Sequence, residues 1–188
     1  MIRYAAAEDA HWAAPLIFEA IGDIAYTLTG AGRPEDAIQV LASFFREKNN
    51  RISYENSLVA MAGEEPVGLL ICYHGSRTEE LDRPFADRLQ HMTGTAPTIV
   101  KEARSDEFYL DTLVVSPRHR GKGVGKKLLL RFEEEAVKQG YDRTALLVEE
   151  ENRRARNLYE QMGYHPDGML RVSGHGYHHM VKLLAVPI

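Results

Sequence analysis

The sequence predicts an α/β (α+β) domain with a mixed, mostly antiparallel twisted sheet of six to seven strands and helices on both faces. Strand-like runs outnumber what a simple parallel sheet would need, and each half of the chain contains two strands that follow one another directly. The composition is that of a globular domain, with 44% hydrophobic and 27% charged residues among 188. We therefore expect one domain over residues 1–188.

The first half is expected to hold a strand, two helices and a hairpin. Apolar residues recur at helical spacing from Trp12 to Ile24 and predict one helix over 9–29, which ends at the glycines near position 30. Pro34 suits the first turn of a second helix, which ends before Asn49. The strands are expected over 2–5, 57–62 and 67–74, with a turn at 63–66 between the last two.

Residues 75–106 form a polar insertion with one plausible helix at 86–92. Long excursions of this kind serve as lids or pocket walls, or are solvated insertions without chemistry. The remaining elements are expected in the order strand 107–115, helix 122–139, strand 144–149, helix 154–162, strand 169–172 and strand 177–184.

Charge and cysteine content exclude several classes of protein. The net charge of −4 argues against non-specific binding of nucleic acid. No apolar run approaches the length of a membrane span, and the N-terminus lacks the features of a signal peptide. Cys72 is the single cysteine and suits a small buried side chain. We expect a cytoplasmic protein with no membrane partner.

The most informative segment is the glycine-rich stretch Arg120-Gly121-Lys122-Gly123-Val124-Gly125, between an expected strand and an expected helix. Backbone N–H groups at such a helix N-terminus favour a phosphate. A P-loop would need glycine at position 120 and Ser or Thr at position 127. A dinucleotide fingerprint would need its last glycine one residue later. Both nucleotide interpretations therefore fit poorly.

The same stretch resembles the acyl-CoA loop of the GNAT superfamily of N-acetyltransferases. A second stretch, 151–164, resembles that family's later signature, with an Asn, an Ala, Leu-Tyr-Glu and Gly-Tyr. The resemblance implies the GNAT fold and acetyl-CoA as acyl donor. It implies donor contacts at Leu113, Val114, Val115, Arg120, Gly121, Lys122, Gly123, Val124, Gly125, Lys126, Asn152 and Tyr159. Asn152 also suits a helix N-cap.

Acyl transfer to an amine needs a proton acceptor and a proton donor. Strand alternation places Glu107, Tyr109, Asp111 and Leu113 on one face. The resemblance directs Asp111 towards the acceptor amine, where it would serve as general base, directly or through a water. Its alternative role is pairing with substrate or with an arginine, and Glu107 is the second candidate base. Tyr159 matches the family's general acid, or else packs in the core.

Three histidines, His175, His178 and His179, lie close together in the sequence. Adjacent side chains of a strand point to opposite faces, so these residues do not suit one metal ion, and we expect no metal. They are expected to line the acceptor pocket or to pack.

These features predict direct transfer of acetyl from acetyl-CoA to an amine of a small molecule. The insertion at 75–106 is expected near the acceptor site. A protein or peptide acetyltransferase that acts on an N-terminus or a lysine is one alternative, and a non-catalytic acyl-CoA sensor is another. Exposed strand edges are compatible with a homodimer.

Overall fold

The computed structural model describes residues 1–185, which form one seven-stranded sheet in the order β1-β2-β3-β4-β5-β7-β6. Neighbouring strands are antiparallel except β4 and β5, which are parallel. The mixed, mostly antiparallel sheet predicted from the sequence is confirmed. The strands are β1 (Ile2–Tyr4), β2 (Ser57–Ala62), β3 (Glu65–His74), β4 (Phe108–Val115), β5 (Arg143–Glu149), β6 (His165–Val172) and β7 (His175–Leu183).

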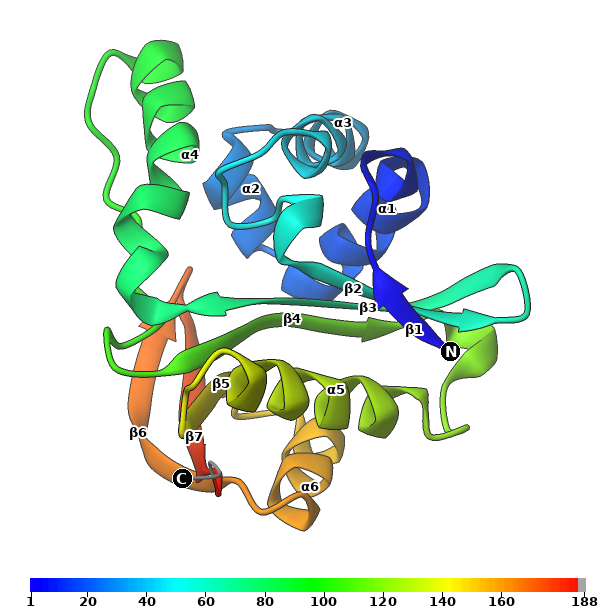
Figure 1. Cartoon of the computed structure of the whole chain (residues 1–188). Helices are drawn as coiled ribbons and strands as arrows, with labels where there is room; N and C mark the ends of the chain where they lie inside the picture. Colours follow the sequence, from blue (N-terminus) through cyan, green and yellow to red (C-terminus); the bar gives the residue numbers. More distant parts are fainter. Residues whose placement is uncertain (186–188) are drawn as a thin grey trace.

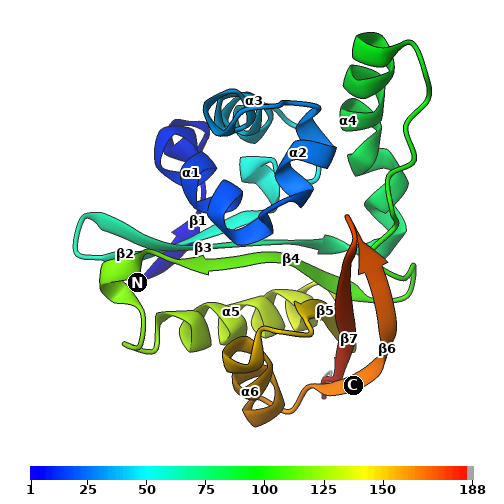
Figure 2. The ribbon, with the colours of Figure 1, turned by 180° about the vertical axis from the view of Figure 1, so that it is seen from behind.

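Helices cover both faces of the sheet, as Figures 1 and 2 show from opposite sides. One face carries the first three helices, and the other carries α5 and α6. Strand alternation explains the two cores, because Leu69 and Ile71 pack under the first helices while Leu70 and Cys72 pack against α5. The helices are α1 (Ala10–Ile21), α2 (Ile24–Thr29), α3 (Pro34–Arg46), α4 (Thr78–Thr93), α5 (Val124–Lys138) and α6 (Arg153–Gln161).

The single helix predicted over 9–29 is wrong, because the chain breaks into α1 and α2 at Gly22 and Asp23. Gly22 has φ of +56°, a conformation that glycine adopts without steric cost. The apolar spacing continues across the break, so periodicity alone does not reveal it. The turn places Gly22 and Asp23 beside a cavity that is described below.

The insertion contains a longer helix than the sequence indicates, since α4 runs through Pro84. Leu81, Phe85 and Leu89 are buried along one side of it. The segment's two ends meet at Gly75, where a β-carbon would lie 1.8 Å from the carbonyl oxygen of Arg104. Only glycine allows this approach, and the approach fixes the path of the chain that leads into β4. Within the described residues, no helix has the length and apolar character needed to cross a bilayer.

Phe132 should be the main anchor of α5 on the sheet. It is fully buried, and its ring stacks on Phe108 with centroids 5.3 Å apart. We expect Phe132→Ala to lower the free energy of unfolding in urea by about 3–5 kcal/mol, because it leaves a cavity. Leu130→Ala is the control on the same helix, since Leu130 is 43% exposed and should change stability by less than about 0.5 kcal/mol. Equal losses in the two variants would contradict this view of the core.

Candidate active site

The sheet opens between β4 and β5. The two strands pair at only three positions, the last being Leu110 opposite Leu146, although both continue for several residues. On its other side, β4 remains paired with β3 up to Val115. Ser116 donates its N–H to Val67 of β3, so alternation along an antiparallel pair directs the N–H groups of Leu113 and Val115 into the gap. The gap therefore offers free main-chain donors.

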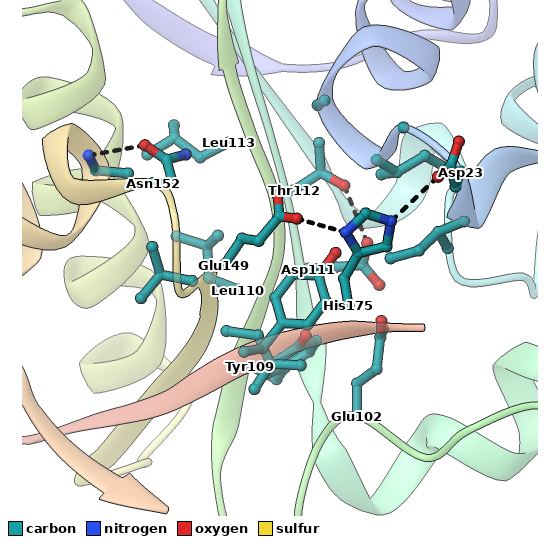
Figure 3. Close-up of a pocket in the computed structure, with 18 of the residues that line it drawn as sticks. Asp23, Glu102, Tyr109, Leu110, Asp111, Thr112, Leu113, Glu149, Asn152 and His175 are labelled. Atoms are coloured by element: carbon teal, nitrogen blue, oxygen red, sulfur yellow. Dashed lines mark hydrogen bonds and ion pairs between the residues drawn. The ribbon is translucent and has the colours of Figure 1, made fainter. Parts of the chain in front are cut away.

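A cavity of about 350 Å³ lies at this opening. Its walls come from β4, the ends of β5 and β7, the turn between α1 and α2, the start of α6 and the end of the insertion. Figure 3 shows how side chains from these separate segments converge on one space. Of the residues predicted for the site, the cavity wall includes Asp111, Leu113, Asn152 and Tyr159.

A β-bulge re-aims Asp111. The register between β3 and β4 shifts so that Ile71 faces Thr112 while Cys72 faces Leu110, which leaves Asp111 without a partner. Tyr109 and Asp111 both lie beside Tyr73, whereas Leu113 packs in the core under α5 with Leu110. The prediction that Leu113 shares a face with Asp111 is therefore wrong, because the extra residue reverses the alternation.

Asp111 is held by a buried arginine. Its Oδ2 accepts hydrogen bonds from Nε and Nη2 of Arg51, at 3.0 and 2.7 Å, and from the Tyr73 hydroxyl at 2.7 Å. Its Oδ1 accepts from the Thr112 hydroxyl at 3.0 Å. The Asp111 side chain is only 3% exposed. The structure thus gives Asp111 the arginine partner that was the alternative to its role as base.

Arg51 contacts two further carboxylates from the insertion. Nη2 donates to Oε2 of Glu102, and Nη1 lies 3.4 Å from Oδ1 of Asp82. Burial alone would lower the pKa of Arg51, but the three carboxylates raise it well above the ordinary value. Burial raises the pKa of Glu102 and of Asp82, with Arg51 opposing the shift in both. One guanidinium therefore contacts three acidic groups.

Tyr159 presents a phenol to the same cavity. Burial raises its pKa to about 12, so the hydroxyl keeps its proton at neutral pH. The hydroxyl forms no hydrogen bond with any residue from 1 to 185, although it lines the cavity. Asn152 caps α6, where its side chain accepts from the N–H of Ala155 at 3.1 Å, and it too lines the cavity.

The glycine-rich loop leads into α5 with its amides free. Gly121 and Gly123 have φ of +77° and +78°, and Gly123 is the residue immediately before the helix. In the described part of the chain, the N–H groups of residues 121 to 126 have no acceptor. These free N–H groups lie at the positive end of the dipole of a 15-residue helix. Such an arrangement favours the binding of an anion.

The comparisons with known proteins decide the family. The model of the Acetyltransferase (GNAT) family matches residues 23–164, which is well over half of the chain. This protein belongs to the GNAT acetyltransferase family. Its sheet, its opening between β4 and β5 and its glycine-rich loop are thus those of a GNAT domain, as the resemblance implied.

Individual relatives agree with the family assignment. An uncharacterized N-acetyltransferase of Bacillus subtilis, YhfO, is 38% identical over 71 residues, or 38% of this chain and 48% of that protein. Thialysine N-epsilon-acetyltransferase of Bos taurus is 36% identical over 56 residues, or 30% of this chain and 33% of the relative. The chain therefore spans about half and about a third of the two relatives.

A solved structure matches over nearly the full length. The N-acetyltransferase from Staphylococcus aureus Mu50 superimposes with a TM-score of 0.82 at 25% identity, covering 97% of this chain and 100% of that one.

Several residues near the cavity of this GNAT domain were not predicted from the sequence. Arg51 lies 60 residues before its partner Asp111, and Glu102 lies in an irregular segment, so neither has a local signal. Arg154 of α6 approaches the glycine-rich loop, with Nη2 3.9 Å from the place of a β-carbon on Gly121. Arg120 instead turns its guanidinium to the Val115 carbonyl and to Glu19.

Glu107 and two of the histidines lie outside the cavity. Glu107 is fully buried, and its carboxylate contacts Nε2 of His179 at 2.9 Å, so it does not line the cavity. His178 contacts Arg156. His175 alone of the three lines the cavity, where Nδ1 lies 2.7 Å from Glu149 and Nε2 lies 3.1 Å from Asp23. This GNAT domain thus closes one side of its cavity with a charged bridge, visible in Figure 3.

The bridge predicts an unusual titration for His175. Hydrogen bonds to Asp23 and Glu149 raise the pKa of His175 above the ordinary value of about 6.5. The charged bridge is therefore complete at lower pH and is lost as the pH rises through the raised pKa. We expect an NMR titration of the histidine ring protons to give His175 a midpoint above 6.5 and Asp23→Asn to lower it. Burial lowers the pKa of His74, so its midpoint should lie on the other side of that value. A midpoint for His175 below that of His74 would contradict the bridge.

Proposed function

We propose that this chain transfers the acetyl group of acetyl-CoA directly to an amine of a small molecule, in one ternary complex. The observation that carries the proposal is the set of free amides at 121 to 126 beside the opening between β4 and β5. The CoA pyrophosphate fits the amide row. The pantetheine arm fits the gap, where the N–H groups of Leu113 and Val115 and the Asn152 side chain lie ready for its polar groups.

The surrounding residues fit this donor. Gly121, Gly123 and Gly125 leave room for close approach of a phosphate, since a β-carbon would meet little or nothing within 4 Å at any of them. Lys122, Lys126 and Arg154 add positive charge near the loop in a chain of net charge −4. The N–H of Val124 belongs to the amide row, whereas alternation turns the main chain of Val114 towards β3 and its side chain is buried under the first helices, so the expected donor contact at Val114 is not supported. When bound, acetyl-CoA would supply the electrophilic thioester carbonyl.

The reaction then depends on proton transfers by this chain's own residues. An acceptor amine is protonated at neutral pH, and it must lose a proton before its nitrogen can attack. The Arg51 cluster supplies carboxylates for this step, with Asp111 at the bulge facing the acceptor side. The Tyr159 hydroxyl is protonated at neutral pH and can donate its proton to the leaving thiolate. The N–H groups of Leu113 and Val115 stabilise the negative charge that develops on the carbonyl oxygen.

The cavity favours a small acceptor over a protein chain. The β6–β7 hairpin reaches over to the first helices, where His175 contacts Asp23 and the Ser173 hydroxyl lies 3.0 Å from that of Thr27. The insertion supplies a further wall through Glu102. The bovine relative is named for thialysine, which is a small molecule too. A reduced, buried Cys72 suits the cytoplasm as the compartment.

A screen tests the proposal. Acetyl-CoA would be offered together with a panel of small amines and of peptides, and free thiol would be measured. We expect turnover with one or more small amines. Turnover with peptides alone would point to a protein acetyltransferase. Binding of acetyl-CoA without turnover on any acceptor would point to a sensor.

Gly123→Ala tests the amide row. An alanine at this positive φ should lower the free energy of unfolding by about 1–2 kcal/mol, and it favours a different conformation of the turn that orients the amides. We expect CoA affinity, measured by calorimetry, to fall about tenfold or more. Gly140→Ala is a matched control, because Gly140 has φ of +83° and equally open surroundings at the far end of α5. It should lose similar stability and keep CoA affinity. If Gly123→Ala binds CoA as well as the control does, the loop is not the phosphate site.

Tyr159→Phe tests the proton donor. The substitution removes only the hydroxyl, so CoA affinity should stay within about twofold while kcat falls about 100-fold, in the usual range for a general acid. Tyr141→Phe serves as control on a tyrosine away from this cavity. Unchanged kcat in Tyr159→Phe would show that the ring only packs.

A further inference from the structure

We propose that Glu102, at the end of the insertion, is the group that takes the proton from the acceptor's ammonium, while Asp111 holds Arg51 in place. This inference rests on the proposed acetyltransferase function and deepens it. It assigns the acceptor class as an amine that arrives as a cation. It also gives the insertion a chemical role besides forming a wall.

Glu102 has the free oxygen that a proton acceptor needs. Its side chain is 8% exposed and lines the cavity. Oε2 accepts from Arg51, whereas Oε1 has no partner among residues 1–185 and is not sealed within the protein. Figure 3 shows the side chain rising from the insertion towards the part of the cavity beside His175 and Asp111. An ammonium in the cavity can therefore donate directly to Oε1.

Asp111 is less suited to take a proton. Three N–H and O–H donors converge on its Oδ2, and a fourth occupies Oδ1. Each of these donors favours the ionised carboxylate. Protonation of Asp111 would break contacts to Arg51 and Tyr73 that organise the whole cluster. Asp111 is therefore a positioning residue in this proposal.

The net negative charge of the Arg51 cluster favours a cationic ligand. Three carboxylates, all at most 12% exposed, surround the one guanidinium of Arg51, so full ionisation leaves two uncompensated negative charges. An excess of buried negative charge is costly, and either a proton or a cation relieves it. Burial raises the pKa of Glu102, and the negative charge of Asp111 adds to the effect while Arg51 opposes it. An arriving ammonium would supply both the charge and the proton.

The groups that face Glu102 come from several elements. They are Arg51 after α3, Tyr73 on β3, Asp82 on α4, Tyr109 and Asp111 on β4, and Tyr177 on β7. Of these, only Arg51 is positive. Burial raises the pKa of Tyr73 and Tyr109 well above the ordinary value and that of Tyr177 to about 12, so the phenols stay neutral.

The proton balance is as follows. The ammonium's N–H bond breaks, its electron pair stays on nitrogen, and the proton passes to Oε1 of Glu102. The neutral amine forms the new C–N bond as the C–S bond breaks, and Tyr159 protonates the sulfur. The nitrogen's surplus proton returns to Tyr159 through water. Glu102 later releases its proton to solvent, so one proton leaves for each acetyl group transferred.

The fold holds Glu102 at this position by a backbone contact. Arg104, two residues on, lies with its carbonyl against Gly75, and its N–H donates to Glu107 at 2.8 Å. These contacts fix the chain between Glu102 and β4. Two contacts of Arg104 thus keep the irregular segment that carries Glu102 against the sheet.

The kinetic test compares three variants with the best amine from the screen. We expect Glu102→Gln to lower kcat at least about 100-fold and to abolish the fall of kcat/KM at acid pH, with CoA affinity unchanged within about twofold. Asp111→Asn should weaken activity yet keep that acid limb. Asp106→Asn is the matched control, since Asp106 is an exposed carboxylate in the same segment. An acid limb that survives Glu102→Gln and disappears in Asp111→Asn would overturn the assignment.

A second measurement needs no turnover and is made on the wild-type protein, with a variant used only to assign the resonance. Glutamate labelled with ¹³C at the carboxyl carbon would report each side chain by NMR, and Glu102→Asp would identify the Glu102 resonance. We expect Glu102 to titrate above the ordinary value of about 4.3 in the wild-type protein. A midpoint at or below that value would overturn its role as base. Absence of turnover on every amine in the wild-type protein would defeat the acetyltransferase proposal itself, which the kinetic result on Glu102 alone would not.

Discussion

The divergence of β4 from β5 is the constraint on which the rest of this molecule depends. Both strands have hydrogen-bonding edges that a continuous sheet would satisfy, and leaving them open has a cost in free energy. The cost is tolerated because each strand is paired on its other side. β4 is hydrogen-bonded to β3, and β5 is hydrogen-bonded to β7 along its length. Each strand is thus stable without its neighbour. The opening therefore presents main-chain donors that are already aligned.

Three different kinds of physical control act around that opening. Backbone conformation sets the amide row, through glycines at positive φ. Register sets the acceptor face, through the bulge at Asp111. Charge determines the part of the cavity beside Arg51, whose guanidinium contacts carboxylates from three separate parts of the chain. The amide row lies at the start of α5, whereas the other two controls meet at Asp111 on β4.

Local signals revealed the donor half of the site, and the acceptor half depended on long-range packing. The loop at 120–125 has its glycines, its preceding strand and its following helix within a few residues, so its conformation could be inferred directly. The bulge at Asp111 depends on the register with β3, and the Arg51 pair joins residues 60 apart. The break at Gly22 had a local signal, the Gly-Asp pair, but the apolar spacing across it indicated a continuous helix.

The contact between Gly75 and Arg104 has a consequence for how this protein could change over time. It brings the two ends of the insertion together, so the outer tip of that segment, beyond the buried Leu81, Phe85 and Leu89, could change in length without moving the strands that the insertion joins. Under the proposed function, changes at this tip could alter the preference for an acceptor while the glycine-rich loop and the opening between β4 and β5 stay unchanged. A side chain at position 75 would separate those two ends, since a β-carbon there would lie 1.8 Å from the carbonyl oxygen of Arg104.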